Sequence, residues 1–441
     1  MKFRGLAVAL VLGSLVASLG TSLGAILGAS VASADEGLQY RGYLLARLQA
    51  FPPDTEALLY PMLNVEKYQG FLEANLDLTW KGNRYTVRSD TSALYRIAPS
   101  GCREGSKLPG CLIINELYLT YDVVPDHLIV LMGRHRPSWG AALSYHPVEP
   151  MNPAPDPTDP TFQRLGAWTA MVELSGETYV ATAGWFPKVS HSALGTPDSL
   201  APGLVGGRYA WRPTSFDISG IAFVDLETGL PEVGTAGSTV LGNSSFEVHG
   251  EVLVHQRREI KTGTLEQGTC PIHSLGIPYR EVWDYSGIVG TRWDQGDGTL
   301  VSLEYLHNGD GMVGDDFRAV LNTADLLKQM CAEGRLEPSD ASEDGRPQQL
   351  SNILLRRNYV ILSGIKPKFA EEGQLSNLGV TATLLAGLDD ASGVFSARAI
   401  YTLRDTVLVR LGGLATFGRA RTQYGVLPFH GMILADVQAL F

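Results

Sequence analysis

Long runs in which apolar and polar residues alternate recur along almost the whole chain. In "KYQGFLEANLDLTW", residues 67–80, Leu72, Leu76 and Trp80 share one face, and Glu73 and Asp77 lie on the other. A period of two is typical of a β-strand, because successive side chains point to opposite sides of the backbone. The repetition of this pattern predicts an all-β fold.

Eighteen such runs can be counted between residues 38 and 441. The predicted strands are 38–50, 67–80, 84–97, 111–124, 127–134, 166–175, 177–186, 204–213, 215–225, 233–242, 245–257, 281–294, 299–308, 354–368, 374–388, 392–403, 406–418 and 429–441. All but one contain ten residues or more, whereas strands of soluble proteins usually contain about 5–6. The segment 233–242 is the weakest of these predictions, and losing it with one neighbour would leave 16 strands.

Strands of this length and pattern predict a transmembrane, antiparallel, up-and-down β-barrel. An open sheet edge in hydrocarbon leaves backbone groups unpaired, and a closed barrel removes the edges. The apolar faces would meet lipid and the polar faces would line the lumen. Aromatic residues near the strand ends, such as Trp80, Tyr85, Trp211 and Trp283, agree with the aromatic girdles of such barrels. A soluble β-sandwich is the alternative, but it does not account for the strand length.

The connections between the predicted strands differ in length on the two sides of the barrel. The long segments, which all fall on one side, are 51–66, 98–110, 135–165, 187–203, 258–280 and 309–353. Short turns face the periplasm in bacterial barrels and long loops face the outside. We therefore expect extracellular loops at 135–165 and 309–353. The latter should contain an amphipathic helix at about 315–334 that packs on a neighbouring loop.

The first 34 residues have the pattern of a secretory signal peptide. Lys2 and Arg4 precede an uncharged stretch that ends in the small residues Ala32, Ser33 and Ala34. This pattern predicts cleavage of segment 1–34, which leaves residues 35–441 as a barrel in the bacterial outer membrane, surrounded by its lipid. A retained anchor helix is the alternative.

The last predicted strand ends in an aromatic residue, Phe441. We expect this residue and its strand to act as the membrane-insertion signal through which the barrel-assembly machinery receives the chain. No partner is expected among nucleic acids, since the formal net charge is −11.

The four cysteines suit an exported protein. Cys102 and Cys111 share one stretch rich in glycine and proline, and Cys270 and Cys331 each lie in a long irregular segment. An even count in an oxidising compartment predicts two disulfides, and we expect the pairs 102–111 and 270–331. Metal binding is the alternative, but the chain has no CxxC motif.

Motifs of catalysis and cofactor binding are missing from the predicted mature chain. Outside the predicted signal peptide, the sequence contains no GxSxG, HExxH, GxxxxGK[ST] or CxxC. His249 and His255 share a predicted lumenal face with Glu247 and Glu251, but alternating polar residues are ordinary in a barrel wall. Ser245 near His249 lacks a third group to orient a hydrolase pair. We expect no enzymatic activity, no cofactor and no metal.

The most distinctive segment is "GRHRPSWGAALSYHPVEPMNPAPDPTDP", residues 133–160. It contains 7 of the 24 prolines of the chain, and proline cannot donate to a strand ladder. This composition predicts a loop folded into the lumen as a constriction, directly after a strand that carries Arg134 and Arg136. An ordinary surface loop is the alternative.

The arrangement of Gly133, Arg134, Trp139 and Gly140, followed by N-P and D-P-T-D-P, resembles bacterial outer-membrane barrels of the porin type, including the alginate-export-like channels. The barrel pattern of most of the chain agrees with this resemblance, but its specific part is limited to 133–160. The resemblance implies a barrel of the strand number counted above, with a charged lumen through which an acidic polysaccharide leaves. It also implies that Arg134 and Arg136 are pore-lining charges at the constriction.

The predicted lumen carries basic and acidic residues in equal numbers. The inward arginines are Arg41, Arg47, Arg84, Arg88, Arg96, Arg208, Arg212, Arg292, Arg356 and Arg410. The inward carboxylates are Glu73, Asp77, Asp90, Glu116, Asp122, Glu173, Glu247, Glu251, Glu304 and Asp436. We expect these residues to line the pore. An exporter of a polyanion should have a mainly basic lumen, so the balance argues against alginate itself.

These observations together predict a passive, water-filled channel, since barrels of about 16–18 strands leave an aqueous interior. The expected cargo is hydrophilic solutes, above all carbohydrate or a secreted polysaccharide delivered by periplasmic export components. The alternative is an adhesion or structural protein that uses its loops and has a plugged lumen, and a barrel hydrolase is a more distant one.

Overall fold

The computed structural model describes nine stretches of the chain. These are residues 37–58, 67–96, 110–152, 166–191, 197–213, 215–242, 244–260, 279–334 and 354–441. The expected signal peptide lies outside them, as do Cys102 and Cys270, so its cleavage and the two cysteine pairings stay predictions.

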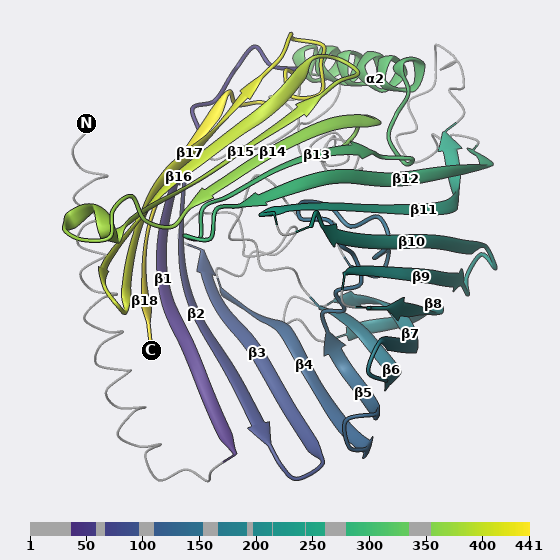
Figure 1. Cartoon of the computed structure of the whole chain (residues 1–441). Coiled ribbons are helices and arrows are strands. Elements are labelled where there is room, and N and C mark those ends of the chain that lie inside the picture. Colours follow the sequence, from purple (N-terminus) through teal and green to yellow (C-terminus); the bar gives the residue numbers. More distant parts are fainter. Residues whose placement is uncertain are drawn as a thin grey trace.

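The described residues form eighteen strands. They are β1 (Leu38–Ala50), β2 (Tyr68–Lys81), β3 (Tyr85–Arg96), β4 (Gly110–Val124), β5 (Leu128–His135), β6 (Ala167–Ser175), β7 (Tyr179–His191), β8 (Pro197–Trp211), β9 (Phe216–Asp225), β10 (Pro231–Val240), β11 (Phe246–Ile260), β12 (Tyr279–Asp294), β13 (Leu300–His307), β14 (Asn358–Lys366), β15 (Leu378–Gly387), β16 (Ser392–Arg404), β17 (Val407–Phe417) and β18 (Gly431–Leu440). Each strand pairs antiparallel with the next, and β18 pairs with β1, so the sheet closes into a barrel (Figure 1). The predicted fold and strand count are confirmed.

The seam of the barrel lies between the first and last strands. Tyr43 faces Leu440 at one end of this pairing, and Ala50 faces Ile433 at the other. Beyond β18, the N–H of Phe441 donates to the carbonyl of Gly42 and the Gly42 N–H donates back, at 3.0 and 2.9 Å. The ladder therefore continues to the last residue, and no strand edge is left open along this stretch.

The strand predictions fail mainly at one long hairpin. The segment 187–203 was expected to be a loop, but β7 runs to His191 and β8 begins at Pro197. The register shifts between Phe186 and Lys188. Such a bulge takes Pro187 out of the ladder, so its missing N–H costs no hydrogen bond. By contrast, the weak segment 233–242 corresponds to a strand, β10, which begins and ends two residues earlier than predicted, at Pro231 and Val240.

Exposure along the strands is the reverse of that in a soluble sheet protein. In β2, the outward Leu76 and Trp80 are 37% and 46% exposed, whereas the inward Asn75 and Asp77 are 6% and 7% exposed. The wall thus has an apolar exterior and a polar interior. This arrangement suits a barrel whose outer solvent is hydrocarbon.

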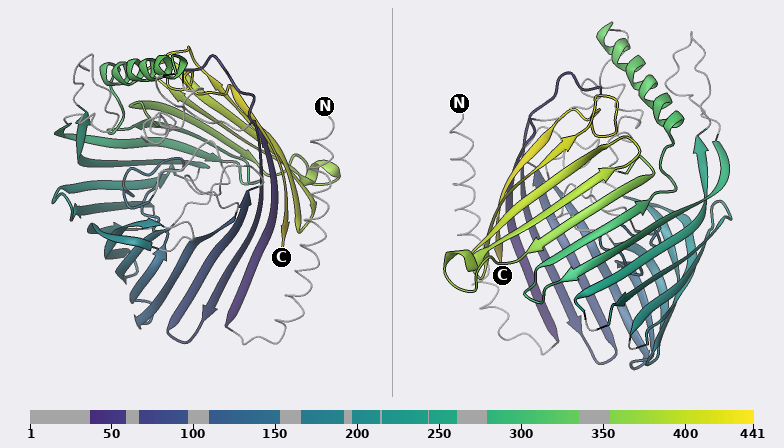
Figure 2. Two further views of the ribbon diagram at one scale, coloured as in Figure 1. Left: turned by 180° about the vertical axis from the view of Figure 1, so that it is seen from behind. Right: turned by 45° about the horizontal axis from the view of Figure 1, so that its top comes forward.

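The helix α2 (Gly314–Ala332) confirms the helix predicted in the longest connection. The Nζ of Lys328 donates to the backbone carbonyls of Glu56 and Ala57, at 3.0 and 3.2 Å. Arg421 donates to Asn322 at 2.9 Å and pairs with Asp325 at 2.5 Å. The helix therefore packs on two neighbouring loops, at the rim away from the C-terminus (Figure 2). Within the described stretches, no helix is long and apolar enough to cross a membrane.

Strand directions place the expected long connections on this same rim. The opposite rim carries short turns, with one exception. The connection from β14 to β15 there spans residues 367–377 and ends in a short 3-10 helix, η2 (Gln374–Asn377). The strand expected from residue 374 therefore begins later, at Leu378.

Candidate functional site

The segment that follows β5 folds back into the barrel (Figure 1). Within this lumenal loop, residues 136–152, Trp139 and Val148 are buried to 4% and 0% exposure. They pack on inward side chains of the wall, namely Phe186, Leu204, Ile221, Phe223, Ala236 and Leu253. Further along, Ala142 joins a second buried cluster that includes Leu306 and Tyr359. The described part of the loop thus lies inside the barrel, as the constriction hypothesis expects.

The indole of Trp139 provides the main aromatic contact between loop and wall. It stacks on Phe223 with ring centroids 5.4 Å apart and an interplanar angle of 10°. It also meets Phe186 edge to face at 5.6 Å. Aromatic pairs of this kind add about 0.5–1.5 kcal/mol beyond the burial of their area.

Two carboxylates of the wall bind the backbone of the lumenal loop. Glu251 on β11 accepts the N–H of Ala142 at 2.6 Å and lies 3.1 Å from Nδ1 of His146. Glu304 on β13 accepts the N–H groups of Leu143 and Ser144, at 2.8 and 3.1 Å.

Glu251 and Glu304 are therefore anchors of the loop as well as residues of the inner wall. They are 5% and 1% exposed, so the loop covers the two carboxylates that the sequence suggests as pore-lining charges. Nε2 of His249 lies 2.8 Å from Glu304. This places His249, considered above for a metal or a hydrolase, beneath the loop.

A third carboxylate, Glu149, organises the loop from within. It accepts the N–H groups of Trp139 and Gly140 at 2.7 and 2.8 Å, and the side-chain amide of Asn152 at 2.7 Å. Sequence reasoning missed this residue. The sequence signal that could have revealed it is a lone acidic residue between two prolines. In the structure the Glu149 side chain is buried, with 4% exposure.

The distinctive pattern around the end of β5 also has a local explanation. Gly133 has φ of +130°, and a Cβ there would lie 2.2 Å from the carbonyl oxygen of Leu117, so only glycine fits. Arg134 is 3% exposed, and its Nε donates to the carbonyl of Gly166 at 2.8 Å. Arg136 donates its backbone N–H to Glu116 at 3.2 Å. These residues shape the exit of the chain from β5 into the loop.

A charged patch lies on the inner wall at β1 to β4. Asp77 lies between Arg41 and Arg88, at 2.7 and 3.1 Å, and Arg88 reaches Glu116 at 3.5 Å. The predicted residues Arg41, Asp77, Arg88 and Glu116 are thus brought together in one network. Nearby, the hydroxyl of Tyr43 donates to Glu73 at 2.8 Å.

A second network lies at the seam. Asp436 on β18 lies between Arg47 on β1, at 3.7 Å, and Arg410 on β17, at 3.2 Å. Other predicted residues pair around the wall as Arg292–Glu247, Arg212–Asp217 and Arg208–Asp217.

In most of these pairs the arginine is the more exposed partner. The side chain of Arg41 is 76% exposed and that of Asp77 9%, and the values for Arg88 and Glu116 are 28% and 8%. The same order holds for the pairs Arg292–Glu247, Arg212–Asp217 and Arg410–Asp436. Arg208 is the exception, at 10%. Within most of these ion pairs, the more exposed charge is therefore that of the arginine.

Arg84 and Arg356, which were predicted to line the pore, lie beyond the ends of the strands, as Arg136 and Arg212 do. Arg84 is in the turn between β2 and β3. Arg356 precedes β14 beneath α2, where its guanidinium lies 4.6 Å from the centre of the Phe317 ring. They belong to the two rims of the barrel.

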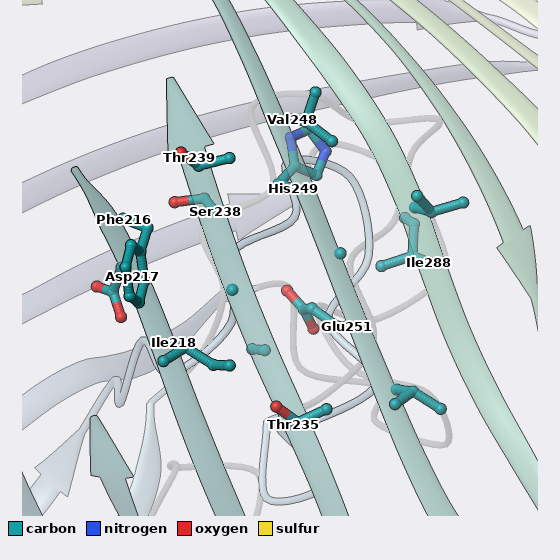
Figure 3. Close-up of a pocket in the computed structure, with 15 residues that line it drawn as sticks. Phe216, Asp217, Ile218, Thr235, Ser238, Thr239, Val248, His249, Glu251 and Ile288 are labelled. Atoms are coloured by element: carbon teal, nitrogen blue, oxygen red, sulfur yellow. The ribbon is translucent and has the colours of Figure 1, made fainter. Parts of the chain in front are cut away.

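A hollow of about 570 Å³ lies over β9 to β12 (Figure 3). Its border includes Ile218, Val248 and Val289, which are 46%, 37% and 54% exposed on the outward face. Gly237 and Gly250 form part of its floor. The inward residues Asp217, His249 and Glu251 of the same strands also line it, so the hollow combines apolar and polar side chains.

Comparison with known proteins identifies the fold. No protein-family model matches the chain, and no curated protein sequence is detectably similar. OccAB1 of Acinetobacter baumannii has a TM-score of 0.55 at 11% identity, over 93% of this chain and 98% of that chain. The outer membrane protein opdK of Pseudomonas aeruginosa has a TM-score of 0.52 at 11% identity, over 91% and 99%. OccAB2 of Acinetobacter baumannii has a TM-score of 0.52 at 8% identity, over 91% and 98%. Identities this low show a shared fold alone.

Proposed function

We propose that the chain forms a passive, water-filled channel for hydrophilic solutes in the bacterial outer membrane. The observation that carries this proposal is the closed barrel of eighteen strands with an apolar exterior and a charged interior. Barrels of about 16–18 strands leave an aqueous channel, and an apolar band on the outside suits lipid. Its shared fold with the outer membrane protein opdK supports the same location.

The lumenal loop would narrow the channel from one side. It is packed on the wall formed by β7 to β11 and continues along that wall to β13 and β14, and Leu143 within it remains 37% exposed. Solutes would pass between this loop and the inner wall at β17, β18 and β1 to β4. That wall carries the networks around Asp77 and Asp436.

The lining favours solutes with negative charge. Exposed guanidinium groups, such as that of Arg41, attract anions, and their buried carboxylate partners are shielded by them. Among the carbohydrate and polysaccharide cargoes inferred from the sequence, those bearing carboxylates fit best. The same proposal includes periplasmic export components that deliver a polysaccharide to the channel, and the barrel-assembly machinery that inserts the barrel into the membrane.

Planar-bilayer recording on residues 35–441 tests the channel. The expected result is a steady conductance whose reversal potential in a salt gradient indicates preference for anions. Arg41→Ala should reduce that preference, and Arg318→Ala, on the outer helix α2, should leave it unchanged. An inserted barrel without conductance would contradict the proposal and favour the plugged adhesion protein.

A further inference from the structure

The two wall carboxylates beneath the lumenal loop, Glu251 and Glu304, form one anchoring unit, and His249 contacts the second of them. His249 on β11 reaches Glu304 on β13 across the intervening strand β12. The residue of β12 opposite both of them is Gly290, where a Cβ would lie 2.6 Å from Cγ of Glu304 and 2.7 Å from Nε2 of His249. The absence of a side chain at this position is what allows the contact.

Three consecutive backbone amides of the loop point at this unit. They belong to Ala142, Leu143 and Ser144, and their acceptors within the described part of the chain are the carboxylates of Glu251 and Glu304. A buried N–H without an acceptor is costly. The loop can keep this position only while the two carboxylates accept.

The two carboxylates use their oxygens differently. Glu304 accepts Leu143 and His249 through Oε1 and Ser144 through Oε2. Glu251 contacts Ala142 and His146 through Oε1 alone, and its Oε2 has no hydrogen-bond partner among the residues that the structure describes. A glutamine can replace a carboxylate that uses one oxygen, but it cannot replace one that uses both.

We propose that Glu251 and Glu304 are positioning residues that hold residues 136–152 against the wall and thereby set the width of the channel. Glu304 is the one that requires a carboxylate. The effect on channel width rests on the proposed channel function. The attachment of the loop to the wall does not depend on that function. It replaces the view of these two residues as pore-lining charges, which would make both equally sensitive to loss of charge.

Four variants of the full chain test the proposal by single-channel recording. Glu304→Gln and Glu304→Ala should give unsteady currents with brief partial closures, since the freed loop moves in the lumen. Glu251→Ala should do the same, whereas Glu251→Gln should remain steady. The matched control is Glu247→Gln, which removes a carboxylate on the same strand that pairs with Arg292 and not with the loop. It should change ion selectivity and leave the current steady.

Amide hydrogen exchange on the refolded barrels supplies a second readout that needs no conductance. Exchange at residues 142–144 should rise about ten- to a hundredfold in Glu304→Gln, the equivalent of losing hydrogen bonds to a charged acceptor. It should stay at the wild-type rate in Glu251→Gln. Equal effects of the two glutamine variants, or none in either, would overturn the proposal. If the wild type conducts no current in bilayers, but exchange at 142–144 rises in Glu304→Gln and not in Glu251→Gln, the proposed channel function is wrong and the proposed attachment of the loop is supported.

Discussion

Gly140 approaches Glu251 so closely that a β-carbon on the glycine would lie 2.4 Å from Oε1 of the carboxylate. The same atom would lie 2.3 Å from Nδ1 of His146. Glycine at this position therefore allows the lumenal loop to lie against its anchor.

Gly140→Ala should displace the loop from Glu251 and lower the free energy of unfolding by about 1–3 kcal/mol, as expected when a packed site is overfilled. Denaturant unfolding in detergent measures it. Gly220→Ala is the control, because a Cβ there has nothing within 4 Å. Equal stability of the two variants would argue against tight packing at Gly140.

Trp139→Ala should lower the free energy of unfolding by about 3–5 kcal/mol, because a large buried side chain leaves a cavity against Phe223. The loop should also loosen, so the mean conductance should change while the strand content stays constant. Leu143→Ala is a control in the same loop, since Leu143 is 37% exposed. Circular dichroism and bilayer recording on both variants provide the comparison.

Asp436→Asn should destabilise the seam. Its carboxylate side chain is 0% exposed between Arg47 and Arg410, and removing one partner of a buried charge network costs about 3–5 kcal/mol. Asp217→Asn, at a carboxylate that is 35% exposed, should cost much less. Thermal unfolding midpoints of the two variants would decide this, and similar midpoints would count against the prediction.

Asp389, in the turn between β15 and β16, provides a dependence on pH. Burial alone would raise the pKa of this carboxyl, but hydrogen bonds from the Asn358 side chain and from the N–H groups of Asn358 and Arg357 outweigh it, and the pKa lies below its usual value. The unfolded chain therefore binds this proton more readily than the folded one. The stability from Asp389 is complete above about pH 5 and is lost as the pH falls through the lowered pKa.

Asp389→Asn should consequently reduce stability more at pH 6 than at pH 3, two conditions on either side of about pH 4 where a free aspartate titrates. Unfolding midpoints of wild type and variant at the two pH values measure the difference. A gap that is the same at both would show that the charged form of Asp389 does not stabilise the turn.

Phe441→Ala tests the expected insertion signal. The backbone pairing with Gly42 survives this change, so the refolded variant should keep the barrel. The ring, which lies beside Gly42, is lost. Assembly in cells should fall, as measured by the fraction of folded protein in outer-membrane preparations, and Phe441→Tyr should restore it. Normal assembly of Phe441→Ala would remove the signal role.

Much of the wall could be predicted because alternation is a local property. Each residue of β2 shows its face by its parity, and even the weak run at 233–242 forms a strand, since both of its neighbours, β9 and β11, pair with it. Prediction failed at segment 187–203, which was expected to be a loop. At Pro187 the hairpin continues through a bulge that no period of two can reveal.

The sequence by itself determined the number of strands, the rim that carries the long loops and the polar face of the wall, because these follow from spacing along the chain. Only the tertiary structure decided which inward charges meet the loop and which meet water. Ala142 and Glu251 are 109 residues apart, and Leu143 and Glu304 are 161 apart. Contacts over such separations arise when the barrel closes around the loop. For the same reason, the balance of ten arginines against ten carboxylates did not reveal that the arginines are mostly the exposed partners.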